Sequence, residues 1–107
     1  MFVSTVKMRG RVENRQEILL TIEGIQKEVG LRGGCQSSLC YQDIQDENIF
    51  CLVNAWKTQD DLDRYLQSKI FAALLGIRSI LVRAPEVKVL IEEYKYSYED
   101  NERVPVH

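Results

Sequence analysis

Three side chains in the middle of the chain could hold a small molecule: the amide of Asn54, the indole of Trp56 and the phenol of Tyr65. An amide within an apolar segment must find a hydrogen-bond partner or face a polar pocket. A buried indole N–H has the same requirement. Their spacing predicts a corner between a strand and a helix that frames a pocket. The same residues would also suit a plain hydrophobic core.

The strand that carries this corner is expected from about Ile49 to Trp56. Alternation along a strand places Phe50, Leu52 and Asn54 on the face that also bears Trp56. The opposite face is largely apolar as well. A strand that is apolar on both faces is typical of the centre of a sheet.

Two short helical segments are expected to follow. Thr58 with Asp61 resembles a capping box, in which the hydroxyl accepts an early helical N–H. Tyr65 then lies on the inner stripe of the first segment. Ser68 predicts a second cap, and Phe71 is expected to point into the core from the second segment.

The remaining elements follow from apolar spacing: a strand over residues 2–10, a helix from Asn14 to Gly30, a strand from about Cys35 to Asp43, and a strand from about Glu86 to Tyr96. Asn14 with Glu17 predicts another capping box at the first helix. One domain is expected over residues 1–98, followed by a polar tail over residues 99–107.

The order β-α-β-β-α-β with right-handed crossovers predicts a ferredoxin-like α+β fold. Its four strands form an antiparallel sheet of order 4-1-3-2, with both helices on one face. The other face also carries apolar residues and would be uncovered in a monomer. We therefore expect a homodimer that pairs these sheet faces.

Bulk properties exclude several classes of protein. The net charge of -2 and the pI near 5.4 argue against a nucleic-acid-binding face, which is normally basic. No apolar run approaches the length of a membrane span, and no signal peptide is recognisable. We expect a cytoplasmic protein that binds neither membrane nor nucleic acid. The three cysteines have no metal-binding spacing, so no metal is expected.

The chain resembles the antibiotic biosynthesis monooxygenase family over roughly residues 2 to 98. The resemblance rests on NxW, a Thr-capped helix and SxxF, preceded by a Gly-Cys strand and a DxxDxxxF hairpin (Asp43, Asp46, Phe50). It implies a dimeric α/β barrel that oxidises a small aromatic or quinol-type substrate, often with no metal and no organic cofactor.

The resemblance also implies roles for individual residues. The catalytic candidates are Asn54, Trp56 and Tyr65. The candidates for binding the small aromatic or quinone-like substrate are Thr5, Phe50, Leu52 and Phe71.

Many members of that family carry a histidine in the helix after the tryptophan, where this chain has Tyr65. The only histidine is His107, in the tail. A tyrosine with its ordinary pKa of about 10 is no base near neutral pH. An alternative hypothesis is therefore a non-catalytic dimeric module that binds a small apolar ligand or regulates a partner.

Overall fold

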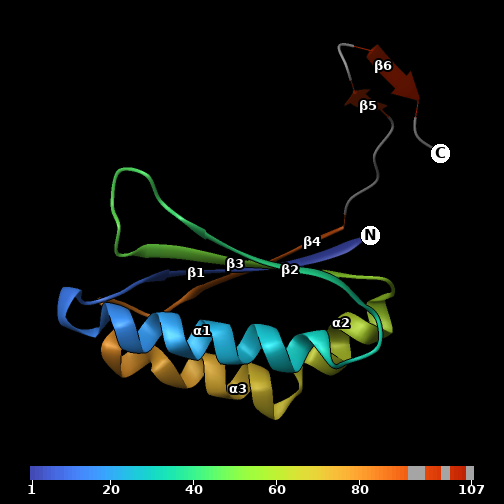
Figure 1. The fold of residues 1–107 in the computed structure, drawn as a ribbon. Coiled ribbons are helices and arrows are strands. Elements are labelled where there is room, and N and C mark those ends of the chain that lie inside the picture. Colours follow the sequence, from blue (N-terminus) through green and yellow to red (C-terminus); the bar gives the residue numbers. More distant parts are fainter. Residues whose placement is uncertain (92–95, 100–101, 106–107) are drawn as a thin grey trace.

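The computed structural model describes residues 1–91, 96–99 and 102–105. Its helices and strands, with 3-10 helices marked η, follow along the chain in this order: β1 (Phe2–Arg9), η1 (Val12–Asn14), α1 (Arg15–Gly30), β2 (Cys35–Gln42), β3 (Ile49–Trp56), α2 (Gln59–Leu66), α3 (Lys69–Leu75), η2 (Gly76–Ile80), β4 (Glu86–Ile91), β5 (Tyr96–Glu99) and β6 (Glu102–Pro105). Figure 1 shows that β1 to β4 form one layer and that the α-helices form a second layer against it.

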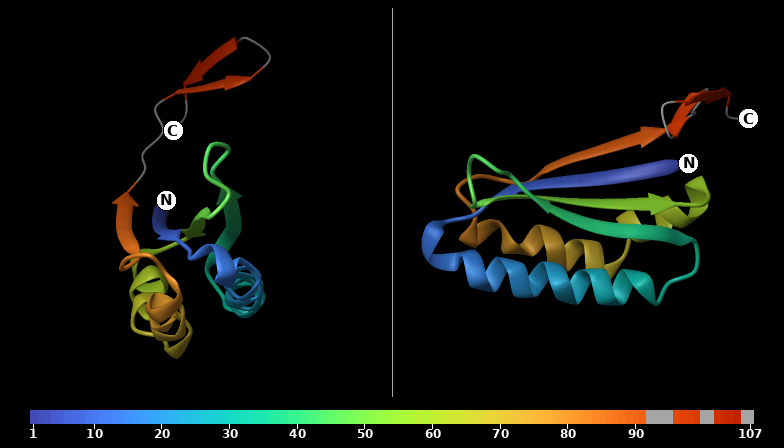
Figure 2. Two further views of the ribbon diagram at one scale, coloured as in Figure 1. Left: turned by 90° about the vertical axis from the view of Figure 1, so that its left-hand side faces the viewer. Right: turned by 45° about the horizontal axis from the view of Figure 1, so that its top comes forward.

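The main sheet has the strand order β2-β3-β1-β4, and its paired strands are antiparallel. This is the predicted order 4-1-3-2 read from the other edge. Both views in Figure 2 place the helices on a single face of the sheet, as predicted. The central strands β1 and β3 pair along their whole length, which puts the Asn54 strand in the middle of the sheet.

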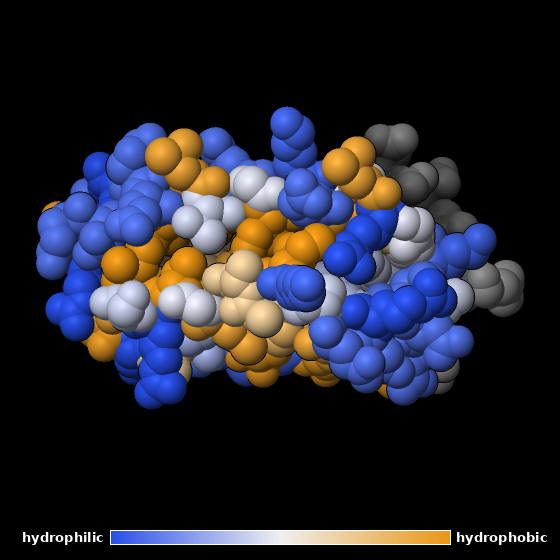
Figure 3. All heavy atoms as spheres, turned by 90° about the horizontal axis from the view of Figure 1, so that it is seen from below, coloured by the Kyte–Doolittle hydropathy of each residue, from blue (hydrophilic) through white to orange (hydrophobic). Residues whose placement is uncertain are grey.

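The core lies between the sheet and the helices. Four residues of α1 at helical spacing are at most 6% exposed: Ile18, Ile22, Ile25 and Val29. They belong to the same core cluster as alternate residues of β1 and β3, and burying each such side chain stabilises the fold by about 1.5–3 kcal/mol. Seen from the helix side, hydrophobic side chains gather near the middle and hydrophilic ones surround them (Figure 3).

Two predicted helix caps are confirmed. The Asp61 backbone N–H donates to Thr58 Oγ1 at 3.1 Å, and the Thr58 hydroxyl donates to Asp61 Oδ2 at 2.7 Å. The Phe71 backbone N–H donates to Ser68 Oγ at 3.1 Å. The two caps fix where α2 and α3 begin, and so fix the positions of Tyr65 and Phe71 within them.

The capping box predicted at Asn14 is wrong. The side chain of Asn14 accepts no backbone N–H and instead donates to Glu17 Oε2 at 3.2 Å. The reason is η1, the 3-10 turn directly before α1. It holds Asn14 at φ -108° and ψ 8°, away from the extended backbone that a capping residue normally adopts.

The last predicted strand is described only in its first part. β4 covers Glu86–Ile91, and residues 92–95 of the prediction lie outside the described residues. Tyr96 begins β5, which pairs with β6 in the segment predicted to be a plain polar tail. His107 also lies outside the described residues.

Candidate functional site

The structure brings Asn54, Trp56 and Tyr65 into one buried cluster, each with a side chain only 1% exposed. Asn54 Nδ2 donates to the Tyr65 hydroxyl at 3.3 Å. The rings of Trp56 and Tyr65 stack at a tilt of 30°, with centroids 4.7 Å apart. The β3-α2 corner therefore joins the three predicted catalytic residues, although eleven positions separate Asn54 from Tyr65.

Ser4 completes this cluster and was not among the predicted site residues. Trp56 Nε1 donates to Ser4 Oγ at 3.2 Å, and Ser4 lies directly opposite Asn54 in the pairing of β1 with β3. Alternation along β1 puts Ser4 on the same face as the buried Val6 and Met8. A hydroxyl in that row was the available signal, because a buried hydroxyl needs a polar neighbour.

The Tyr65 hydroxyl is a weak acid at this position. Burial raises the pKa of Tyr65 to about 12, despite a smaller opposing effect of the hydrogen bond from Asn54. The phenol therefore stays protonated near neutral pH. It can donate or accept a hydrogen bond there, but it cannot serve as a general base.

One polar atom of the cluster is unpaired. Asn54 Oδ1 is buried and has no hydrogen-bond partner among the described residues. An unsatisfied buried acceptor costs about 1–3 kcal/mol. This unmet acceptor lies in the interior next to Tyr65, and Asn54 is not among the residues that line the hollow described below.

A hollow of about 180 Å³ opens beside the two stacked rings. Its lining residues come from the α1-β2 connection, the end of β3 and α2: Arg32, Gly33, Trp56, Asp61, Arg64 and Tyr65. Figures 1 and 2 show the α1-β2 connection passing beside α2. Asn54 does not line this hollow, but it is one hydrogen bond away from Tyr65 in its wall.

Gly34 allows the α1-β2 connection to come this close. Its φ is +89°, and a Cβ at this position would collide with the Asp61 carboxylate. The Gly34 carbonyl accepts a 2.8 Å hydrogen bond from the Lys57 backbone N–H. Only glycine meets both conditions without strain, so Gly34 holds Arg32 and Gly33 against the corner.

The predicted substrate-binding residues are not all near this hollow. Phe71 packs its ring against Tyr65, with centroids 5.1 Å apart. Phe50 and Leu52 lie in the core, at most 1% exposed. Thr5 is paired with Val53 and lies on the opposite face of the sheet from Asn54. None of these four lines the hollow.

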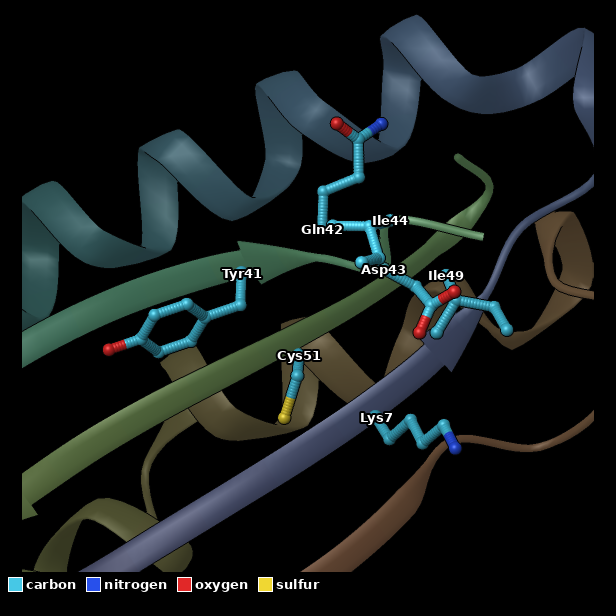
Figure 4. A pocket seen from close by; sticks show the side chains of 7 residues that line it. All are labelled: Lys7, Tyr41, Gln42, Asp43, Ile44, Ile49 and Cys51. Atoms are coloured by element: carbon cyan, nitrogen blue, oxygen red, sulfur yellow. The ribbon is translucent and has the colours of Figure 1, made fainter. Parts of the chain in front are cut away.

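A second hollow, of about 270 Å³, lies on the sheet face away from the helices. Figure 4 shows its lining from β1, β2, β3 and the β2-β3 hairpin: Lys7, Tyr41, Gln42, Asp43, Ile44, Ile49 and Cys51. Partial burial raises the pKa of the Cys51 thiol, and the neighbouring Lys7 ammonium lowers it by less. The thiol is therefore not activated as a nucleophile.

All three cysteines are free and half-buried. Cys40 is paired with Leu52 and Cys51 with Tyr41, so the two thiols lie on opposite faces of the sheet. No group of three or more potential metal ligands occurs in the part of the chain that the structure describes. In that same part, no helix is both long and apolar enough to cross a membrane.

The strand order, with the α-helices packed on one face of the sheet, defines a ferredoxin-like α+β protein. The model of the family described as "Antibiotic biosynthesis monooxygenase" matches residues 1–75. The chain belongs to this family. No curated protein sequence matches it.

Solved structures share the fold at low sequence identity. A conserved protein from Methanosarcina mazei Go1 is 21% identical with a TM-score of 0.77, over 87% of this chain and 94% of that one. Rv0793 from Mycobacterium tuberculosis is 16% identical with a TM-score of 0.80, over 90% and 98%. A crystal structure of an antibiotic biosynthesis monooxygenase is 15% identical with a TM-score of 0.77, over 88% and 100%.

Proposed function

We propose that this protein is a cofactor-independent monooxygenase that oxidises a small aromatic or quinol-type substrate with O2. The observation that carries the proposal is the buried Asn54-Tyr65 pair beside Trp56, with Asn54 Oδ1 unpaired. Membership of the monooxygenase family supports the same reaction class.

The proposed chemistry needs no external reductant. A phenol and O2 yield a quinone and water: one oxygen atom becomes the new carbonyl, and the other leaves with two substrate hydrogens. All electrons come from the substrate. The protein must then hold the substrate oxygen and exclude water. Tyr65 would bind that oxygen, Asn54 would orient the Tyr65 hydroxyl through their hydrogen bond, and Trp56 would form the apolar wall.

Oxygen consumption tests this proposal. The metal-free protein is incubated with a panel of phenols and quinols, and dissolved O2 is followed with an electrode. We expect turnover with at least one of them. Activity should fall by at least about tenfold in Asn54→Ala, which loses the hydrogen bond to the Tyr65 hydroxyl, and in Trp56→Phe, which changes the shape of the wall. Gln36→Ala, an exposed position on β2, serves as the control and should keep full activity.

The raised pKa of Tyr65 favours a second candidate, a non-catalytic module that binds a small apolar ligand or regulates a partner. In the family, a histidine at this position would be the natural base; here the group is a phenol with a pKa of about 12. An absence of turnover across the panel, together with stabilisation by one of its members, would support the module and refute the enzyme.

We further propose that the protein is a homodimer that pairs the sheet faces opposite the helices. The support is the exposure of apolar residues on that face, among them Leu39 at 49%, Tyr41 at 55% and Leu90 at 50%. A partner there would also cover the hollow in Figure 4.

We also propose that the protein works in the cytoplasm. The three free thiols are consistent with such a reducing compartment.

Light scattering at micromolar concentration checks the dimer. We expect twice the chain mass of 12.4 kDa, and a shift to the monomer in Leu39→Glu, because a buried unpaired carboxylate opposes pairing. The matched control is Leu20→Glu on the helix side, where the leucine is 58% exposed, and it should remain dimeric. A wild-type protein at the monomer mass would refute the proposed dimer.

A further inference from the structure

We infer that the hollow beside Trp56 and Tyr65 binds an anionic aromatic molecule with a single ring, held by Arg32. This inference rests on the proposed function, because it names the substrate class of the same site. It follows from the volume of the hollow, the rings in its wall and the charges at its rim.

The volume limits the size of the ligand. A cavity of about 150 Å³ holds one benzene ring, and this hollow measures about 180 Å³. Trp56 and Tyr65 are among the residues that line it, and aromatic side chains in a wall favour contact with another aromatic ring. One ring with a small substituent fits, whereas a three-ring quinone would need the wall to move.

The charges at the rim favour an anion. Arg64 NH2 lies 3.7 Å from Asp61 Oδ1, and Asp61 Oδ2 also accepts the hydrogen bond from the Thr58 hydroxyl. These two charges therefore offset each other. Arg32 forms no ion pair within the described residues, so its guanidinium is the uncompensated charge beside the aromatic wall.

Arg32 could also compensate for the absence of a general base, because it favours the ionised form of a bound phenol. Tyr65 stays protonated near neutral pH because its pKa is raised to about 12. A nearby guanidinium lowers the pKa of a bound phenol by favouring its charged form. Arg32 would thus select the phenolate directly, and a carboxylate of similar size would bind through the same contact.

Binding of benzoate tests this inference, and benzoate is not oxidised by the proposed reaction. Calorimetry gives the affinity, and the fluorescence of Trp56, the only tryptophan in the chain, reports occupation of this hollow. We expect benzoate to bind at least about tenfold more tightly than neutral benzyl alcohol, and to weaken as salt is added. Anthracene-2-carboxylate, with three rings, should bind at least about tenfold more weakly than benzoate.

Three arginine variants locate the charge. Arg32→Gln should abolish the preference for benzoate over benzyl alcohol. Arg64→Gln should keep most of it, and Arg78→Gln, at a residue that does not line the hollow, controls for net charge. Three results would each overturn the inference: equal affinity of the wild type for benzoate and benzyl alcohol, an unchanged preference for benzoate in Arg32→Gln, or benzoate binding without a change in Trp56 fluorescence.

The two proposals can fail separately. Binding of benzoate through Arg32 without oxygen consumption on any phenol would refute the monooxygenase and leave the anion site. Oxidation of neutral quinols by a protein that does not distinguish benzoate from benzyl alcohol would refute the anion site and leave the monooxygenase.

Discussion

Trp56→Ala is expected to lower the free energy of unfolding by about 3–5 kcal/mol. The indole is 1% exposed and stacks on Tyr65 at 4.7 Å. Its N–H donates to Ser4 Oγ. Truncation removes these contacts and opens a cavity in the wall of the hollow. Urea unfolding followed by far-ultraviolet circular dichroism measures the loss, because the variant has no tryptophan fluorescence.

Trp56→Phe is the matched comparison. It keeps an aromatic ring against Tyr65 but removes the N–H that Ser4 accepts, so we expect less than half the loss seen in Trp56→Ala. Since a domain of this size has only about 5–15 kcal/mol of total stability, the alanine variant should be close to unfolding. A loss below about 1 kcal/mol in Trp56→Ala would mean that the indole is not packed as described.

The second large effect is a loss of stability at alkaline pH that depends on Tyr65. Its pKa is about 12 in the folded chain, against an ordinary value of 10.0. Below pH 10 the phenol is protonated in both states, so its contribution is fully present. As pH rises from 10 to 12, only the unfolded state loses the proton, and the folded state is destabilised relative to it. The loss approaches about 2.7 kcal/mol above pH 12.

Comparison with Tyr65→Phe isolates this effect from other titrating groups. The variant should start about 1–3 kcal/mol less stable, because Asn54 Nδ2 loses its acceptor. It has no phenol at this position, so its deficit relative to wild type should shrink by about 1.3 kcal/mol between pH 9 and pH 11. Urea unfolding at both pH values measures the change. A constant deficit would contradict the raised pKa.

Local periodicity accounts for the parts of the fold that the sequence predicted correctly. The bounds of β3, the two caps at Thr58 and Ser68, and the shared face of Asn54 and Trp56 follow from the chemistry of neighbouring residues. The exception was Asn14, where a 3-10 turn changed the backbone that capping requires. Asparagine favours the N-cap position, but the backbone of Asn14 follows the preceding 3-10 turn and is not extended as a capping residue requires.

The sequence by itself determined which residues face the core and that Asn54 is a polar group among them. Only the tertiary structure decided which residues these side chains contact. Trp56 bonds to Ser4 across 52 positions, and Arg32 reaches the corner because α1 ends beside α2. The physical reason is that strand register and helix packing set such contacts, whereas periodicity reports only the face of one element.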